Sequence, residues 1–233
     1  MRKVPFIRNE NIETAALILL AAYGRQYGAV SAPPVPVDGI LESHLGLSLD
    51  FDDLPRRLGL RDALGATWMQ ARRVVVDQSL DPSRDASREG RYRFTVGHET
   101  GHWVLHRGFF LEAAGQQSLF GDEAKPSIVC RTGSRKDPME WQADAFAGFL
   151  LMPKEFVFHA WEKHTGGRAP YVAEDEIKGL SEKWWLGEDT QPTVEIARMM
   201  ARDFAVSGQA MQIRLIGLGL VRTEQPEPDL FKG

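Results

Sequence analysis

The chain has 233 residues, of which 43% are hydrophobic and 26% charged, enough for one sizeable core or for one core with a small appended subdomain. Its formal net charge of -4 and its pI of about 5.9 exclude a global basic field of the kind that attracts nucleic acid or anionic lipid. The only cysteine, Cys130, excludes an internal disulfide framework and fits a reducing compartment, so we expect a cytoplasmic protein.

The first residues combine a basic start with the apolar run 15–22, a pattern similar to an export signal. Glu10 and Glu13 interrupt that pattern, and Ile12, Ala16, Leu19, Tyr23 and Tyr27 recur at helical spacing. The run is also much shorter than the about 20 residues that cross a bilayer. We therefore predict a buried amphipathic helix and no membrane segment.

The next part of the chain is predicted to form a small sheet. A proline-rich stretch, 31–37, leads into a short helix over 38–45 that Asp38 can cap. Short β-branched or alternating runs follow, separated by charged and glycine-bearing turns. These predicted strands are 48–51, 66–71 and 73–77.

The rest of the chain is predominantly helical. Between its first two helices, residues 115–137 are rich in Gly, Ser, Lys, Asp and Pro, so we expect a long loop there. The predicted helices are 91–106, 138–152, 153–166, 174–185, 194–204 and 207–216. The fold class is therefore α+β, with a small sheet packed against several helices and a helical C-terminal part. We assign 1–190 to one domain, 191–222 to a helical pair packed on it, and 223–233 to a flexible tail.

The first of these predicted helices, 91–106, carries the central motif. Residues His98-Glu99-Thr100-Gly101-His102 match H-E-x-x-H, a spacing that places both imidazoles on one face of a helix with the glutamate beside them. Two such histidines can hold zinc, or a replaceable Mn²⁺ or Fe²⁺, and Glu99 can act as the general base toward a water molecule. Gly97 and Gly101 leave a stripe without side chains on this helix, which predicts a close neighbour there.

A catalytic zinc also needs a third protein ligand. His106 lies about 12 Å along the helix from His98, too far to share an ion with it, so we interpret it as a partly buried histidine at the helix end. Glu140 is the better candidate, although with Asp137 as N-cap it also suits the capping-box position. The capping interpretation leaves Asp144 unexplained. An aspartate one turn after a zinc ligand can accept the spare ring N–H of a ligand histidine.

Together these segments resemble the ImmA/IrrE family of gluzincin-type metallopeptidases. The resemblance is carried by 93–106 (RFTVGHETGHWVLH), Glu140, 143–147 (ADAFA) and 150–153 (LLMP), and weaker similarity extends over most of the chain. It implies an α+β zinc peptidase that cleaves a partner helix-turn-helix repressor and so releases a stress, mobile-element or phage-related operon. The stretch between His102 and Glu140 is longer than is usual in the family. We see no fused N-terminal helix-turn-helix and expect little room for a sensor domain beyond Gly219. If the peptidase activity is regulated, we therefore expect the regulatory signal to act through a partner, the metal supply or the long loop.

Two alternatives from other classes stay open. A DNA-binding regulator is suggested by 201–207 (ARDFAVS), which is similar to the turn of a helix-turn-helix, but the helix after it carries only one basic residue, Arg214. A catalytically inactive interaction or toxin-like module could keep the metal as a structural element, although such a site has no use for Glu99.

Three further side chains could take part in catalysis. Cys130 could be the nucleophile of a cysteine peptidase with His98 or His159 as its partner, but we expect an ordinary loop cysteine. Either His159 or His164 could donate to the oxyanion of a tetrahedral intermediate, and the sequence does not choose between them.

Overall fold

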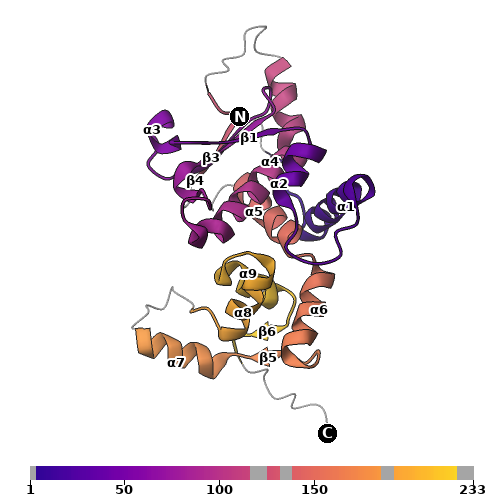
Figure 1. The fold of residues 1–233 in the computed structure, drawn as a ribbon, viewed down its shortest axis with the longest axis vertical. Helices are drawn as coiled ribbons and strands as arrows, with labels where there is room; N and C mark the ends of the chain where they lie inside the picture. The colour runs from indigo at the N-terminus through magenta and orange to yellow at the C-terminus, as the bar shows by residue number, and fades with distance from the viewer. Residues whose placement is uncertain (1–3, 116–124, 132–137, 185–191, 225–233) are drawn as a thin grey trace. The chain divides into compact units, whose positions relative to one another are not determined.

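The structure is a computed structural model that describes residues 4–115, 125–131, 138–184 and 192–224. The chain divides into two compact units, Met1–Pro153 and Lys154–Gly233, each of which is described by itself (Figure 1). The predicted domain 1–190 covers the whole first unit and part of the second, and it stays a prediction. Among the described residues, no helix has both the length and the apolar character that crossing a membrane requires.

The first unit contains a four-stranded sheet in the order β1-β3-β2-β4. Its strands are β1 (Ser48–Asp52), β2 (Ala63–Trp68), β3 (Arg73–Asp77) and β4 (Ile128–Arg131). β1 runs parallel to β3, whereas β2 is antiparallel to both β3 and β4. The three valines of β3 are fully buried, and β-branched side chains suit such a central strand. β4 thus brings a distant part of the chain to the open side of β2.

Helices cover this sheet. They are α1 (Asn9–Tyr27), α2 (Val37–Gly39) with a π-helical turn over Ile40–His44, α3 (Leu54–Leu58), α4 (Glu89–Gly115) and α5 (Pro138–Leu151). α4 contacts β2 and β3, and α5 contacts both α4 and α1 (Figure 1). The predicted close approach at the two glycines of α4 is confirmed. A Cβ atom at Gly97 would lie 3.3 Å from Cβ of Ala147, and one at Gly101 would lie 3.2 Å from Cα of Ala143.

The second unit is mainly helical. Its elements are α6 (Lys154–Thr165), β5 (Tyr171–Val172), α7 (Glu174–Trp184), α8 (Glu195–Phe204), α9 (Gly208–Gly217) and β6 (Val221–Arg222). The two short strands pair in parallel, and α8 contacts both α6 and α9. Its core contains the fully buried side chains of Trp161, Met200, Phe204 and Leu215. Ser207 caps α9 by accepting a hydrogen bond from the backbone N–H of Ala210.

The α+β class is confirmed, and the structure corrects three local expectations. The predicted loop 115–137 contains β4, whose pattern is too short to be recognised and whose conformation is fixed by pairing with β2. Asp38 does not cap its short helix, because Pro36 occupies the cap position. The helix α3 is missing from the predicted elements, although Asp53 caps it and Pro55 lies in its first turn. The predicted cap Asp137 and the tail beyond Glu224 lie outside the described residues.

Candidate metal centre

The two motif histidines meet on the buried face of α4. The Nε2 atoms of His98 and His102 are 2.9 Å apart, and the two side chains are only 2% and 0% exposed. The distance follows from the helix, since residues four apart lie on the same face one turn away. Two neutral imidazoles that point their lone pairs at a common position can share a metal ion.

Glu140 reaches the same position from α5. It is the third residue of that helix, and its Oε2 and Oε1 atoms lie 3.3 Å and 3.4 Å from Nε2 of His98 and His102. Donor atoms of a tetrahedral zinc site with bonds of about 2.1 Å are about 3.4 Å apart, so the glutamate-to-histidine distances suit such an ion. The ligand atoms of the three residues all lie within 4.8 Å of one another. The arrangement could therefore hold a metal.

The ionisation states of two of these side chains suit metal binding. Burial lowers the pKa of His102 to about 4, so the ring is neutral at pH 7 and can offer a lone pair. Burial opposes the ionisation of Glu140, but hydrogen bonds to His102 and His98 outweigh it and hold the pKa of that carboxyl well below its usual range. The group thus presents an anionic oxygen between two histidines.

Asp144 fixes the orientation of His98. Its Oδ1 atom lies 2.8 Å from Nδ1 of that ring, one helical turn beyond Glu140. A carboxylate at this distance accepts a hydrogen bond from Nδ1–H, so in the neutral ring that a metal needs the lone pair lies on Nε2. The structure therefore brings together all five residues singled out in the sequence: His98, Glu99, His102, Glu140 and Asp144.

His102 is oriented by a hydrogen-bonded chain that the sequence analysis missed. Its Nδ1 atom lies 3.0 Å from Nδ1 of His106, whose Nε2 atom lies 2.9 Å from Oε1 of Gln142. The amide nitrogen of Gln142 in turn donates to the carbonyl of Pro5. Because a carbonyl only accepts, Oε1 of Gln142 must accept from His106, and a neutral His106 must accept from His102. This series of hydrogen bonds therefore puts the proton of His102 on Nδ1 and leaves its lone pair on Nε2.

Glu99 lies beside the histidines, fully buried and facing the sheet. Thr67 on β2 donates a hydrogen bond of 2.6 Å to its Oε2 atom. Gly65, two residues earlier, leaves the room that the carboxylate needs, because a Cβ atom there would be 2.5 Å from Oε1. Burial raises the pKa of Glu99 to about 7, against the opposing effects of His98 and Thr67. A carboxylate with such a pKa is suited to accepting and returning a proton near neutral pH.

Cys130 lies in β4 and not in a loop, contrary to expectation. It pairs with Gly65 of β2. Sulfur, a ring nitrogen of His98 and a carboxylate oxygen of Glu99 form a second group within 4.8 Å of one another. Burial raises the pKa of the thiol, which disfavours the thiolate that a cysteine peptidase needs.

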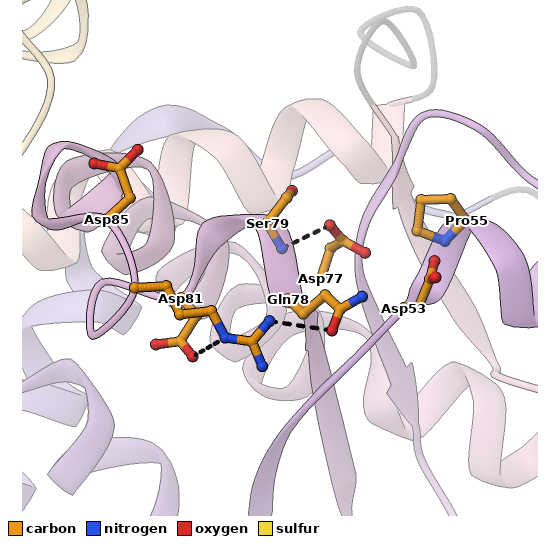
Figure 2. Close-up of a pocket in the computed structure, with 8 residues that line it drawn as sticks. Asp53, Pro55, Asp77, Gln78, Ser79, Asp81 and Asp85 are labelled. Atoms are coloured by element: carbon orange, nitrogen blue, oxygen red, sulfur yellow. Dashed lines mark hydrogen bonds and ion pairs between the residues drawn. The ribbon is translucent and has the colours of Figure 1, made fainter.

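The described residues also form a surface pocket away from these groups. Four aspartates line it, Asp53, Asp77, Asp81 and Asp85 (Figure 2). Arg84 also lines it, and it forms a hydrogen bond with Gln78 and an ion pair with Asp81. Each aspartate accepts hydrogen bonds from backbone N–H groups at a turn or helix start. Their role is explained by local backbone structure, and none of the histidines of α4 lines the pocket.

The remaining candidates from the sequence lie in the second unit. His159 and His164 belong to α6, where His164 pairs with Asp203 at 2.8 Å. α8 and α9 are joined by a short turn, as in a helix-turn-helix, with Ala205 in the left-handed conformation. The only basic residue of α9, Arg214, is 8% exposed, so its side chain is buried and cannot reach DNA bases. This observation disfavours the DNA-binding alternative.

One of three comparisons with known proteins identifies a family. No curated protein matches the chain. Among solved structures, a Mycobacterium tuberculosis transcriptional regulator is similar with a TM-score of 0.46 and 15% identity, over 90% of this chain and 47% of the regulator. The chain thus spans about half the length of that regulator. A family model described as the IrrE N-terminal-like domain matches residues 54–175, slightly more than half of the chain and the part that holds the metal-binding motif. The chain therefore belongs to the ImmA/IrrE family of metallopeptidase-like proteins.

Proposed function

We propose that the protein is a zinc-dependent endopeptidase in which His98, His102 and Glu140 hold the ion and Glu99 is the general base. The observation that supports it best is the convergence of two imidazole nitrogens and one carboxylate on a buried position beside a second carboxylate. A structural zinc site is closed by four protein ligands, whereas a three-ligand site leaves a position for water. Mn²⁺ or Fe²⁺ could replace zinc, because imidazole and carboxylate ligands also suit those ions.

In the proposed reaction, the metal ion and the protein side chains have different roles. Zinc, when bound, polarises the scissile carbonyl and lowers the pKa of its water to about 7. Glu99 accepts the proton of the attacking water and delivers it to the departing amine. Thr67 holds one carboxylate oxygen by its hydrogen bond of 2.6 Å, which leaves the other oxygen for this transfer. General-base catalysis of this kind contributes about 10²–10⁴-fold to the rate.

Asp144, His106 and Gln142 act on the ligands and not on the substrate. Each ligand histidine has its Nδ1 atom engaged by one of these partners, at 2.8 Å for His98 and 3.0 Å for His102. Both rings are therefore held with Nε2 toward Glu140 before an ion arrives. Such partners usually raise metal affinity or activity by about 10–100-fold.

For the substrate we propose a helix-turn-helix transcriptional regulator in the cytoplasm, whose cleavage releases a stress or mobile-element operon. Membership of the family supports a protein substrate. The acidic chain and the buried Arg214 favour an enzyme that acts on the regulator and does not itself bind DNA. The single cysteine supports a reducing compartment.

The test is a cleavage assay of the metal-loaded protein against the helix-turn-helix protein encoded beside its gene. We expect one specific cut that requires the metal, is lost on chelation and falls by orders of magnitude in Glu99→Gln, which keeps its metal and its fold. Cleavage that is unchanged in Glu99→Gln would refute the mechanism. A protein that binds the regulator without cutting it, under the same conditions, would favour the inactive interaction module.

A further inference from the structure

The carboxylate of Glu99 lies against two residues of strand β2. Thr67 donates its hydroxyl to Oε2 at 2.6 Å, and both side chains are fully buried. Gly65, two residues earlier, lies on the same face of the strand, because side chains alternate along it. A Cβ atom at Gly65 would be only 2.5 Å from Oε1 of Glu99. The space beside that oxygen therefore exists because residue 65 has no side chain.

The two oxygens of this carboxylate have different surroundings. Oε2 accepts the hydrogen bond from Thr67, whereas Oε1 is buried and no described residue forms a hydrogen bond with it. A buried carboxylate oxygen is stabilised by a donor or a cation. Oε1 is therefore the oxygen of Glu99 that remains able to accept a hydrogen bond, and then a proton, from an attacking water molecule.

The backbone of Thr67 is fixed on both sides of its strand. It pairs with Val74 of β3 and with Ile128 of β4. The branched Cβ atom also restricts rotation of the side chain. The register between β2 and β4 is irregular immediately before Gly65, and irregularities of this kind change the direction of side chains beside active sites. The hydroxyl of Thr67 is thus presented to Glu99 from a rigid position.

We propose that Thr67 and Gly65 are positioning residues for the hydrolysis. Thr67 fixes Oε2 of Glu99, so that Oε1 is the atom that carries the proton, and Gly65 keeps the position beside Oε1 open. The inference rests on the proposed function, because Glu99 is the base that is oriented. The water oxygen bonds to the carbonyl carbon and its proton passes to Oε1. Oε1 then delivers that proton to the nitrogen as the C–N bond breaks, and the hydrogen bond at Oε2 persists throughout.

The first test compares kcat with KM in metal-loaded variants, with the helix-turn-helix protein encoded beside the gene as substrate. Thr67→Val keeps the size of the side chain and removes the donor. We expect kcat to fall by about 10–100-fold, the effect of displacing a catalytic group by about 1 Å. KM and metal content should stay within about twofold of wild type, because the ligands are untouched. Thr67→Ser restores the donor and should recover most of kcat.

Two further variants sharpen this comparison. Gly65→Ala should also lose kcat and retain metal, because its Cβ atom would displace the carboxylate of Glu99 from Thr67. Thr95→Val is the matched control. Thr95 is also buried, but its hydroxyl donates to the carbonyl of Arg91 within α4. Thr95→Val should therefore keep the kcat of the wild type.

A second measurement does not depend on activity. In the metal-free chain, Thr67→Val should lower the urea concentration at the midpoint of unfolding, because Oε2 of Glu99 loses its donor in a buried position. The same substitution in the Glu99→Ala background should shift the midpoint much less, since no carboxylate remains to lose a partner. Equal shifts in the two backgrounds would show that Thr67 acts on the fold independently of Glu99, which would overturn the proposal.

The possible failures are distinguishable. If the wild type cleaves the substrate and Thr67→Val has the same kcat, the inference about Thr67 is wrong and the proposed peptidase function is unaffected. The same conclusion follows if Thr67→Ser is as slow as Thr67→Val, because the hydroxyl would then have no part in the effect. A metal-loaded wild type that cleaves no substrate would overturn the proposed function, and the inference with it.

Discussion

Nδ1 of His102 lies 3.0 Å from Nδ1 of His106, so a histidine that cannot reach the ion still determines how its neighbour presents a lone pair to it. Because Gln142 and the carbonyl of Pro5 complete the chain, the direction of every hydrogen bond in it is set by the one group that can only accept. This relationship connects the N-terminal segment to the candidate metal centre.

We expect His106→Ala to weaken metal binding by about 10–100-fold, the usual effect of removing a partner of a ligand histidine. Competition with a chelating indicator measures the affinity, and far-ultraviolet circular dichroism checks the fold. Gln142→Leu should show a smaller loss in the same direction, because His106 then loses the acceptor that fixes its tautomer. His159→Ala removes an exposed helical histidine and serves as the control. Unchanged metal affinity in His106→Ala would show that the hydrogen bonds from His102 through His106 to Gln142 have no part in metal binding.

Glu140 can be tested as a ligand against its simpler role at the start of α5. Glutamine completes a capping box as well as glutamate does, so Glu140→Gln should be silent if capping is the only role. We expect metal affinity and activity to fall together while helix content stays constant, because a neutral amide is a poorer zinc ligand. Asp144→Asn should give the milder loss of about 10–100-fold. Equal metal content in wild type and Glu140→Gln would assign the third coordination position to another residue.

The stability of the metal-free protein should depend on pH through Glu99. Burial raises its pKa from 4.5 to about 7, so between these values the folded chain binds more protons than the unfolded chain and loses stability as pH rises. Metal-free Glu99→Gln should therefore exceed wild type by up to about 3 kcal/mol at pH 8 and match it at pH 4. Urea denaturation of chelated protein at both pH values measures the difference.

His102 contributes a pH dependence of the opposite sign, which makes the comparison with the variant necessary. Burial lowers its pKa to about 4, so the unfolded chain binds the extra proton between pH 4 and 6.5 and stability rises with pH there. That contribution is common to wild type and Glu99→Gln and cancels in their difference. A difference that does not change between pH 4 and pH 8 would contradict the buried ionisation of Glu99.

The contact between α4 and α5 predicts opposite effects for two glycine-to-alanine substitutions on one helix. At Gly101 a new Cβ atom would lie 3.1 Å from Cβ of Phe146 and 3.2 Å from Cα of Ala143, whereas at Gly108 nothing lies within 4 Å. Gly101→Ala should destabilise the protein by about 1–3 kcal/mol through overpacking. Gly108→Ala should stabilise it by up to about 1 kcal/mol through helix propensity. Thermal unfolding of the two variants measures both, and a stabilised Gly101→Ala would show that the helices can separate.

Much of this arrangement could be predicted from patterns that lie within one helix. One segment contains both the four-residue spacing of His98 and His102 and the two glycines beside them. A second segment contains Glu140 and Asp144, which are four residues and thus one helical turn apart. The partners across the sheet could not be predicted, because Thr67 and Cys130 reach Glu99 and His98 only through the pairing of β2 with β4. β4 offers just four residues, too few for a recognisable alternation. The expectation that His106 is a partly buried histidine at a helix end is wrong, because α4 continues to Gly115 and the side chain is 1% exposed. Its contact with His102 could therefore not be predicted from that expectation.

The account depends most on one metal ion held by His98, His102 and Glu140. Elemental analysis of the purified chain, exposed to excess zinc and then dialysed, tests this claim directly. We predict about one zinc per chain in wild type and in Glu99→Gln, and almost none in His98→Ala or His102→Ala. A wild-type protein that retains no metal, or a His98→Ala variant that is folded and retains as much zinc as wild type, would contradict it.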